Sequence, residues 1–358
     1  FLLYPYESGP YLFIISVLPE MKRIHGKKSY FSLLGEIFLS GNTFSPVKVL
    51  VYSLKILVCI SLLSYTKKRF WVVDHLTIIK NICGLFEIML VISLLTINKP
   101  IFWRLNDVIN RFSKTRLKFL YSEPSVLGIL CGLLVIILLY YIFDNKKNYM
   151  LLKEIVLLAV IILLTFSMSG IVYTAIGIIV LFLFQVFKNK EVIPRRMLTY
   201  FLLGICLLII ILSTNNPISN RFFSMFLGTD GSYNFRWSAA VNVFRKTMEI
   251  TRYWGMGLGN MNTPSGLSFL LNIGIDYKFA NSFLYFFTEN GILGIIYTIY
   301  LFLICTYNCI KSSKNIRPLK VGVLAFAFVS QIAGGYYTDP ILWIMYGIVC
   351  SNEKTVIN

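Results

Sequence analysis

Long uninterrupted apolar runs constrain the fold of this chain more than any other feature. A helix that crosses the hydrocarbon core of a bilayer needs about 20 apolar residues. Of the 358 residues, 57% are hydrophobic and only 14% are charged, which is more apolar surface than a soluble domain buries. We therefore predict an all-α, polytopic transmembrane helical bundle with about ten spans. The candidate spans are residues 1–18, 48–65, 77–97, 125–143, 151–166, 169–187, 197–213, 282–309, 320–337 and 340–352. Because the chain opens at Phe1 rather than at methionine, we expect further residues upstream.

Short basic connectors set the expected orientation of the bundle. The connectors are segments 67–69, 146–147, 188–196 and 311–320. Cytoplasmic loops of membrane proteins carry an excess of Lys and Arg, and an even number of predicted spans separates each pair of these connectors. The sequence therefore predicts one integral-membrane domain over residues 1–358. In this domain a cationic loop, 98–124, and a large loop, 214–281, both face outward.

The two loops predicted to face outward are themselves cationic, which departs from the usual enrichment of Lys and Arg in cytoplasmic loops. The 98–124 loop holds six Lys and Arg residues against two acidic ones, and the 215–281 stretch holds six against three. Long loops escape the bias, so a solvated face is one explanation for the larger loop. An anionic ligand on that side explains both loops better. Arginine suits phosphate because its planar fork donates two parallel hydrogen bonds.

Residues 234–250 are predicted to form an amphipathic helix within the large loop. Trp237, Val241, Phe244 and Met248 recur at helical spacing and form one apolar stripe. Such a helix can lie in the headgroup plane with its stripe in lipid, which would hold Arg236 near lipid phosphates. Packing of the stripe against the bundle is the alternative.

A glycine-rich turn, RYWGMGLGN, follows this helix over residues 252–260. Gly255, Gly257 and Gly259 let the backbone approach a ligand closely and present N–H groups to an anion. No strand precedes the turn, so it is not a dinucleotide-binding fingerprint. Contact with the substrate is one interpretation of these glycines, and a flexible turn is the other.

No pattern in the sequence predicts a metal site or a cofactor. The seven cysteines lie in or beside apolar runs, and the two histidines, His25 and His75, are isolated. Neither a disulfide framework nor a cluster with metal-ligand spacing is therefore expected. The positive-inside bias is the first explanation for the net charge of +18, so we do not expect nucleic acid as a partner.

Several short motifs occur in a fixed order between about residue 98 and residue 350. They are RLKFLYSEPS (116–125), SMSG (167–170), Arg236-Trp237 followed by GMGLGN (255–260), ANSFL (280–284), ENGILG (289–294) and PILW (340–343). In this order they resemble the motifs of the O-antigen ligase/polymerase superfamily. Within that superfamily the chain most resembles a Wzy-type polymerase of O-antigen or capsular repeat units. Two positions depart from the pattern, since Ala280 stands where the family has histidine and Met168 where it has arginine.

The resemblance implies a GT-C-like glycosyltransferase that acts on undecaprenyl-diphosphate-linked glycan at the outer face of the bacterial plasma membrane. The absence of histidine at position 280 favours a polymerase of repeat units over a ligase that moves a finished glycan. An acceptor hydroxyl would attack the donor and expel undecaprenyl diphosphate, and cationic side chains would stabilise the leaving charge without a metal. A lipid-linked glycan transporter or flippase is the alternative of a different class; it would need the same recognition without the chemistry.

The resemblance and the charge pattern together nominate the site residues. We expect Arg116, Arg236 and Arg252 to bind the diphosphate, and Arg221 and Arg245 are second choices. The other expected substrate contacts are Gly255, Gly257, Gly259, Asn281 and Glu289. The candidates for the general base are Glu123, Asp276 and Glu289. An intramembrane carboxylate such as Glu289 is a functional candidate by default, although a structural partner for a buried arginine explains it equally well.

The expected partners follow from the same resemblance. They are the undecaprenyl-diphosphate-linked donor and acceptor glycans and the lipid bilayer. A flippase and a chain-length regulator of the same pathway are the candidate protein partners. We expect no cofactor.

Overall fold

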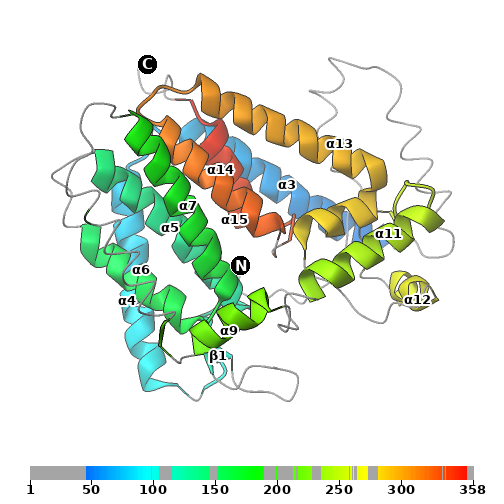
Figure 1. Cartoon of the computed structure of the whole chain (residues 1–358), viewed down its shortest axis with the longest axis horizontal. Coiled ribbons are helices and arrows are strands. Elements are labelled where there is room, and N and C mark those ends of the chain that lie inside the picture. Colours follow the sequence, from blue (N-terminus) through cyan, green and yellow to red (C-terminus); the bar gives the residue numbers. More distant parts are fainter. Residues whose placement is uncertain are drawn as a thin grey trace.

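The computed structural model is helical over most of the residues that it describes (Figure 1). These are residues 46–97, 99–104, 115–144, 151–188, 199, 213–214, 217–227, 235–257, 259, 261, 264–272, 281–332, 334 and 336–352. In chain order the first elements are α3 (Pro46–Arg69), α4 (His75–Leu95), β1 (Trp103–Arg104), β2 (Arg116–Leu117), α5 (Pro124–Asp144), α6 (Leu152–Leu164) and α7 (Met168–Lys188). They are followed by α9 (Pro217–Phe226), a π-helical segment η3 (Phe235–Ala239), α11 (Ala240–Ile250), α12 (Pro264–Asn272), α13 (Ser282–Lys311), α14 (Arg317–Ile332) and α15 (Pro340–Cys350).

Four of the described helices are long and apolar enough to cross a membrane. They are α4, residues 124–143 of α5, residues 168–187 of α7, and α13. The bundle is thus compatible with the predicted all-α membrane protein, and its helices follow the predicted spans to within a few residues. By contrast, α6 and α15 have 13 and 11 residues, which is shorter than a complete span. The predicted span 1–18, and 197–213 apart from two residues, lie outside the described residues. The total of about ten spans therefore stays a prediction.

Small residues bring α5, α7 and α14 together at the centre of the bundle. A Cβ atom added to Gly170 of α7 would lie 3.1 Å from the Cα atom of Gly128 in α5. A Cβ atom added to Gly322 of α14 would lie 3.2 Å from the carbonyl oxygen of Gly177 in α7. Helices in membranes lack a hydrophobic drive to associate, so backbone contact through small residues is their main means of close packing.

Hydrogen bonds between the helix ends sort the connectors into two groups. At one end the Trp71 indole donates to the hydroxyl of Ser351 over 2.7 Å, next to the basic segment 67–69. At the opposite end the Asn281 amide donates to the carbonyl of Ile332, and the Ser282 N–H donates to the carbonyl of Gly334 over 3.4 Å. The strand pair belongs to this second end because β2 contacts the connection between α6 and α7. The basic connectors 67–69 and 311–320 thus lie at the opposite end of the bundle from the strand pair and Asn281, and which end faces outward stays a prediction.

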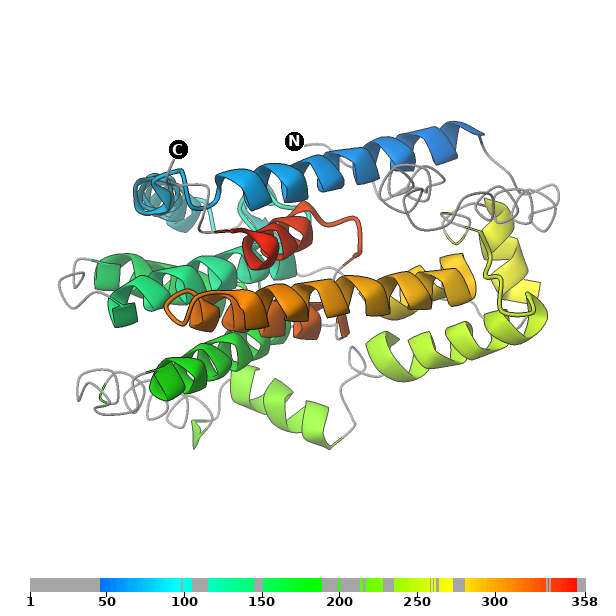
Figure 2. The same ribbon diagram turned by 90° about the horizontal axis from the view of Figure 1, so that it is seen from above.

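The predicted amphipathic helix 234–250 is present as η3 followed by α11, at the edge of the bundle beside the first turns of α13 (Figure 2). Its buried face carries Ala240, Val243, Thr247 and Met248. Of the predicted apolar stripe, Met248 is buried against the bundle, whereas Trp237 and Val241 are 44% and 39% exposed. Small side chains on the buried face let α11 approach α13 closely, and this rotates the larger apolar residues outward.

Candidate functional site

A two-stranded ribbon lies at the end of the bundle where α6 and α7 are joined. Strands β1 and β2 are antiparallel, with Trp103 opposite Leu117 and Arg104 opposite Arg116. Trp103 and Leu117 are buried, and the Trp103 indole donates to the carbonyl of Ser93 over 2.8 Å. This apolar pair anchors the ribbon to the end of α4 and so fixes the position of the two arginines.

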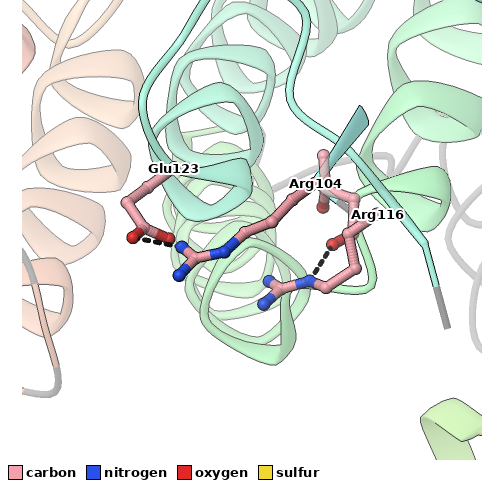
Figure 3. A network of polar contacts seen from close by, with 4 residues as sticks. Arg104, Arg116 and Glu123 are labelled. Atoms are coloured by element: carbon pink, nitrogen blue, oxygen red, sulfur yellow. Dashed lines mark hydrogen bonds and ion pairs between the residues drawn. The ribbon is translucent and has the colours of Figure 1, made fainter. Parts of the chain in front are cut away.

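Arg116 is held by the connection between α6 and α7. Its side chain is only 7% exposed, and its Nε donates to the backbone carbonyl of Thr165 over 2.9 Å (Figure 3). Thr165 precedes Phe166, which has a positive φ of 45°. The same connection is closed by a 2.8 Å hydrogen bond between the hydroxyls of Ser167 and Ser169. Thus the segment predicted to bind phosphate contacts Thr165, two residues before the Ser-Met-Ser-Gly hairpin.

Arg104 forms an ion pair with Glu123, which lies directly before α5 (Figure 3). Glu123 was predicted as a candidate general base, and in this structure its carboxylate accepts from the Arg104 guanidinium. Side chains directly opposite in an antiparallel pair have Cβ atoms about 5 Å apart, and like charges there repel. Glu123 offsets the repulsion between Arg104 and Arg116.

Lys118 adds a third cation to this cluster. Burial lowers its pKa, and the Arg104 guanidinium lowers it further, whereas the Glu123 carboxylate acts in the opposite direction. Among the described residues, the cluster of Arg104, Arg116, Lys118 and Glu123, called the ribbon site below, therefore sets three cations against one carboxylate. Such a surface favours an additional anion.

The glycine-rich turn docks onto a kink in α13. Gly291 interrupts the helix with φ 57° and ψ −144°, and Gly255 of the turn has φ 84°. The Met256 N–H donates to the carbonyl of Thr288 over 2.9 Å, and the Ile292 N–H donates to the carbonyl of Tyr253 over 2.9 Å. A Cβ atom on Gly255 would come within 2.5 Å of the Glu289 carbonyl oxygen, and one on Gly291 would overlap the backbone of residues 253 and 254. Both glycines are therefore required for this backbone-to-backbone contact.

Glu289 is completely buried beneath the turn. Its carboxylate accepts from the hydroxyl of Tyr337 over 2.9 Å, and the backbone N–H groups of Gly259 and Met261 also face it. The turn was predicted to present its N–H groups to a substrate anion. In this structure the side chain that lies against the Gly259 N–H is the chain's own Glu289.

Arg252 and Tyr253 occupy the exposed side of the same turn. Both have positive φ values, 51° and 69°, which residues with a Cβ atom rarely adopt. The Tyr253 N–H donates to the carbonyl of Met248 over 2.9 Å, which fixes this conformation at the end of α11. Strained residues of this kind cluster at functional sites, and here the strain directs a predicted phosphate ligand, Arg252, outward.

Of the remaining predicted contact residues, some have a structural role in the bundle and the others lie outside the described residues. Asn281 is 1% exposed and caps α13, with its side-chain oxygen accepting from the Leu284 N–H over 3.0 Å. Arg245 is exposed and pairs with Glu249 over 3.4 Å, one helical turn along α11. The backbones of α9 and η3 include the other two predicted arginines. The side chains of Arg221 and Arg236, and the whole of Asp276, lie outside the described residues.

Sequence reasoning missed two residues at this end of the bundle. Arg104 was counted only as one cation among six, because its pairing with Arg116 depends on a strand register that no local pattern predicts.

Asp339, the cap of α15, accepts from the Ile341 N–H over 2.9 Å, and burial raises its pKa to about 6. Burial raises the pKa of Tyr121, with smaller contributions from Cys131 and Asp339. The Asp-Pro pair before an apolar run was a recognisable capping signal.

Residues 155–299 match the family model described as O-antigen ligase. The matched stretch includes α6, α7, α11, the glycine-rich turn and the kinked first part of α13. No curated protein and no solved structure matches the chain. The family match supports the O-antigen ligase/polymerase superfamily, whose members are glycosyl-transferring enzymes. Together with the apolar helices, it supports a multi-pass membrane protein.

Proposed function

We propose that this protein polymerises undecaprenyl-diphosphate-linked oligosaccharide repeat units into O-antigen, capsular polysaccharide or exopolysaccharide. The reaction takes place at the outer face of the bacterial plasma membrane. The observation that carries the proposal is the ribbon site, which lies at the same end of the bundle as the first turns of α13 and Asn281. A lipid-linked diphosphate entering from the bilayer would meet an excess of positive charge there.

The chemistry requires stabilisation of a leaving diphosphate. An acceptor hydroxyl attacks the anomeric carbon of the donor sugar, the bond from that carbon to the phosphate oxygen breaks, and its electron pair leaves with undecaprenyl diphosphate. Donors that are fixed before reaction stabilise such charge most effectively, because they need no reorganisation during the reaction. Arg116 meets this condition, since the carbonyl of Thr165 already holds its Nε.

The large loop supplies the other half of the proposed clamp. Arg252 is presented on a strained turn whose backbone is hydrogen-bonded to α13 on both sides of Gly291. Arg236 lies on η3, directly before α11. We assign Arg116, Arg236 and Arg252 to the diphosphates, with Arg221 and Arg245 as second choices.

The alternative activity is that of a ligase, which moves a finished glycan to a different acceptor. The family description favours it, whereas Ala280 in place of the family's histidine favours a polymerase. Incubation of the purified protein with lipid-linked repeat units separates the two activities. A polymerase gives a ladder of lengths without any added acceptor, and a ligase gives a single product only with a foreign acceptor. Unchanged substrate in both reactions would favour a transporter.

The role of the arginines is tested by charge removal. Arg116→Ala and Arg236→Ala should each lower kcat at least about 100-fold, which is typical for the loss of one preorganised donor. Arg→Lys at the same positions should recover only part of this loss, because lysine cannot bind bidentately. The matched control is Lys68→Ala, which removes an exposed cation at the opposite end of the bundle. Full polymer length and rate in both variants of an arginine would remove that arginine from the site.

A further inference from the structure

We propose that Arg104 and Glu123 form an exchange pair within the ribbon site. A phosphate group of the substrate displaces the Glu123 carboxylate from Arg104, and the released carboxylate accepts the proton of the acceptor hydroxyl. This inference rests on the proposed glycosyl transfer and adds to it a second phosphate ligand, Arg104, and a substrate-dependent step.

The Arg104–Glu123 pair has the exposure expected of an exchangeable contact. The two side chains are 32% and 30% exposed, so solvent and ligands reach both. Ion pairs that solvent reaches contribute only modestly to stability, and a competing anion can therefore replace one partner of this half-buried pair. Arg116 differs, because it is buried and bound to a backbone carbonyl that no ligand replaces.

The strand register places a ligand between the two arginines. Arg104 and Arg116 are directly opposite in the ribbon, so their Cβ atoms are about 5 Å apart. Figure 3 shows both guanidinium groups extending from the ribbon on the same side, with Glu123 beyond Arg104. A diphosphate bound bidentately by Arg104 and charge-paired with Arg116 and Lys118 would supply more negative charge than one carboxylate. The exchange therefore improves the charge balance of the ribbon site.

The displaced carboxylate then has a chemical task. While Arg104 holds Oε1 of Glu123, this oxygen is not available to a hydroxyl group. After displacement it can accept the proton of the acceptor hydroxyl as the new bond from oxygen to the anomeric carbon forms. The electron pair of the broken bond leaves with undecaprenyl diphosphate, and the proton on Glu123 passes to water after the product leaves. Coupling the base to phosphate binding would keep it inactive until a donor is in place.

Binding of inorganic pyrophosphate to the purified full-length protein tests the exchange. Glu123→Gln removes the internal competitor and should tighten pyrophosphate binding about 5-fold, the scale of an exposed ion pair. Arg104→Ala should weaken binding about 10-fold. In the Arg104→Ala background, the effect of Glu123→Gln should shrink to below about 2-fold, because little competition remains. Weaker binding in Glu123→Gln, an undiminished effect in the double variant, or no binding of pyrophosphate to the wild type would overturn the proposal.

Turnover separates the exchange from a merely structural ion pair. Glu123→Gln should lower kcat about 100-fold or more while KM falls, because the substrate binds more tightly but the base is lost. Glu123→Asp keeps the carboxylate and should retain part of kcat. The matched control is Glu87→Gln, which removes a carboxylate from the exposed pair with Lys153 and should change neither value. A kcat in Glu123→Gln equal to that of the wild type would refute the role as base.

Two further comparisons show whether a negative result contradicts the proposed function or the exchange, and whether the bound phosphate belongs to the substrate or to a lipid headgroup. If the wild type forms no glycan but the pyrophosphate results hold, the proposed function fails and the phosphate exchange stands, without its catalytic role. If the wild type polymerises but the variants do not differ, the exchange fails and the function stands. Vesicles of phosphatidylglycerol are the third probe, and their binding should be the same for the wild type and Glu123→Gln. A difference seen only with these vesicles would make the ribbon site a headgroup contact and overturn its assignment to the substrate.

Discussion

The contact between the glycine-rich turn and the kink of α13 makes a quantitative prediction for Gly291→Ala. Alanine at this position must adopt φ 57° and ψ −144°, a region that is essentially restricted to glycine, at a cost of about 1–3 kcal/mol. Its Cβ atom would also overlap the carbonyl of Tyr253, so the turn must move away. The two hydrogen bonds that join residues 253 and 256 to α13 would then be lost, at about 1 kcal/mol each.

These costs sum to about 4 kcal/mol. A typical domain is stable by about 5–15 kcal/mol, so the variant should open the turn locally rather than unfold the bundle. A free-energy change of this size corresponds to an increase of about 10³-fold in the population of the open form. Glu289 would then lose the N–H groups of Gly259 and Met261 that face it.

Amide hydrogen exchange of the purified protein measures this opening directly. The amides of Met256 and Ile292 should exchange at least about 100-fold faster in Gly291→Ala than in the wild type. The matched control is Gly84→Ala in α4, where no atom lies within 4 Å of the added Cβ and exchange at these two amides should not change. Wild-type exchange in Gly291→Ala, together with an unchanged Tm, would refute the argument that this glycine is required by its backbone.

Two further predictions concern the turn and the cap of α15. Arg252→Gly should raise stability by about 1 kcal/mol by relieving the positive φ, while lowering polymerisation as much as Arg252→Ala does. If both variants retain activity, Arg252 does not contact the substrate. Burial raises the pKa of Asp339 to about 6, so the folded chain binds this proton more tightly than the unfolded chain. This residue's contribution to stability therefore falls as pH rises from about 4 to 6, and the Tm advantage of Asp339→Asn over the wild type should grow across that window. A constant Tm difference would contradict the assignment.

The helices could be predicted from the sequence because their signal is local. Continuous apolar runs located α4, α5, α7, α13 and α14 to within a few residues. The kink at Gly291 was not predicted, since a glycine inside an apolar helix is often tolerated there without any bend. Its conformation depends on a turn more than thirty residues upstream. The sequence left open whether the apolar stripe of α11 faces lipid or the bundle, because the neighbouring helix determines which side of an amphipathic helix is covered.

The sequence predicted which charged residues belong to the candidate site, but not which of them contact one another. The sequence singled out Arg116 and Glu123, and the structure places both at the ribbon site. The sequence could not show that Arg104 lies between Arg116 and Glu123, because strand register and helix ends are set by tertiary packing. Glu289 was recognised as an unusual intramembrane carboxylate, but its position beneath the turn follows from long-range contacts with Tyr337 and Gly259.

The backbone contact between Gly255 and Gly291 also limits how this protein can be recombined with its relatives. The large loop and the helix that follows it form one inseparable module, since each supplies half of an interlocking joint. A chimaera that exchanges residues 214–281 alone would pair a foreign turn with a native kink and break the joint. A graft that extends through residue 292 would carry both halves together. The large loop of one homologue, with any substrate specificity that it holds, could then be transferred intact to the membrane bundle of another.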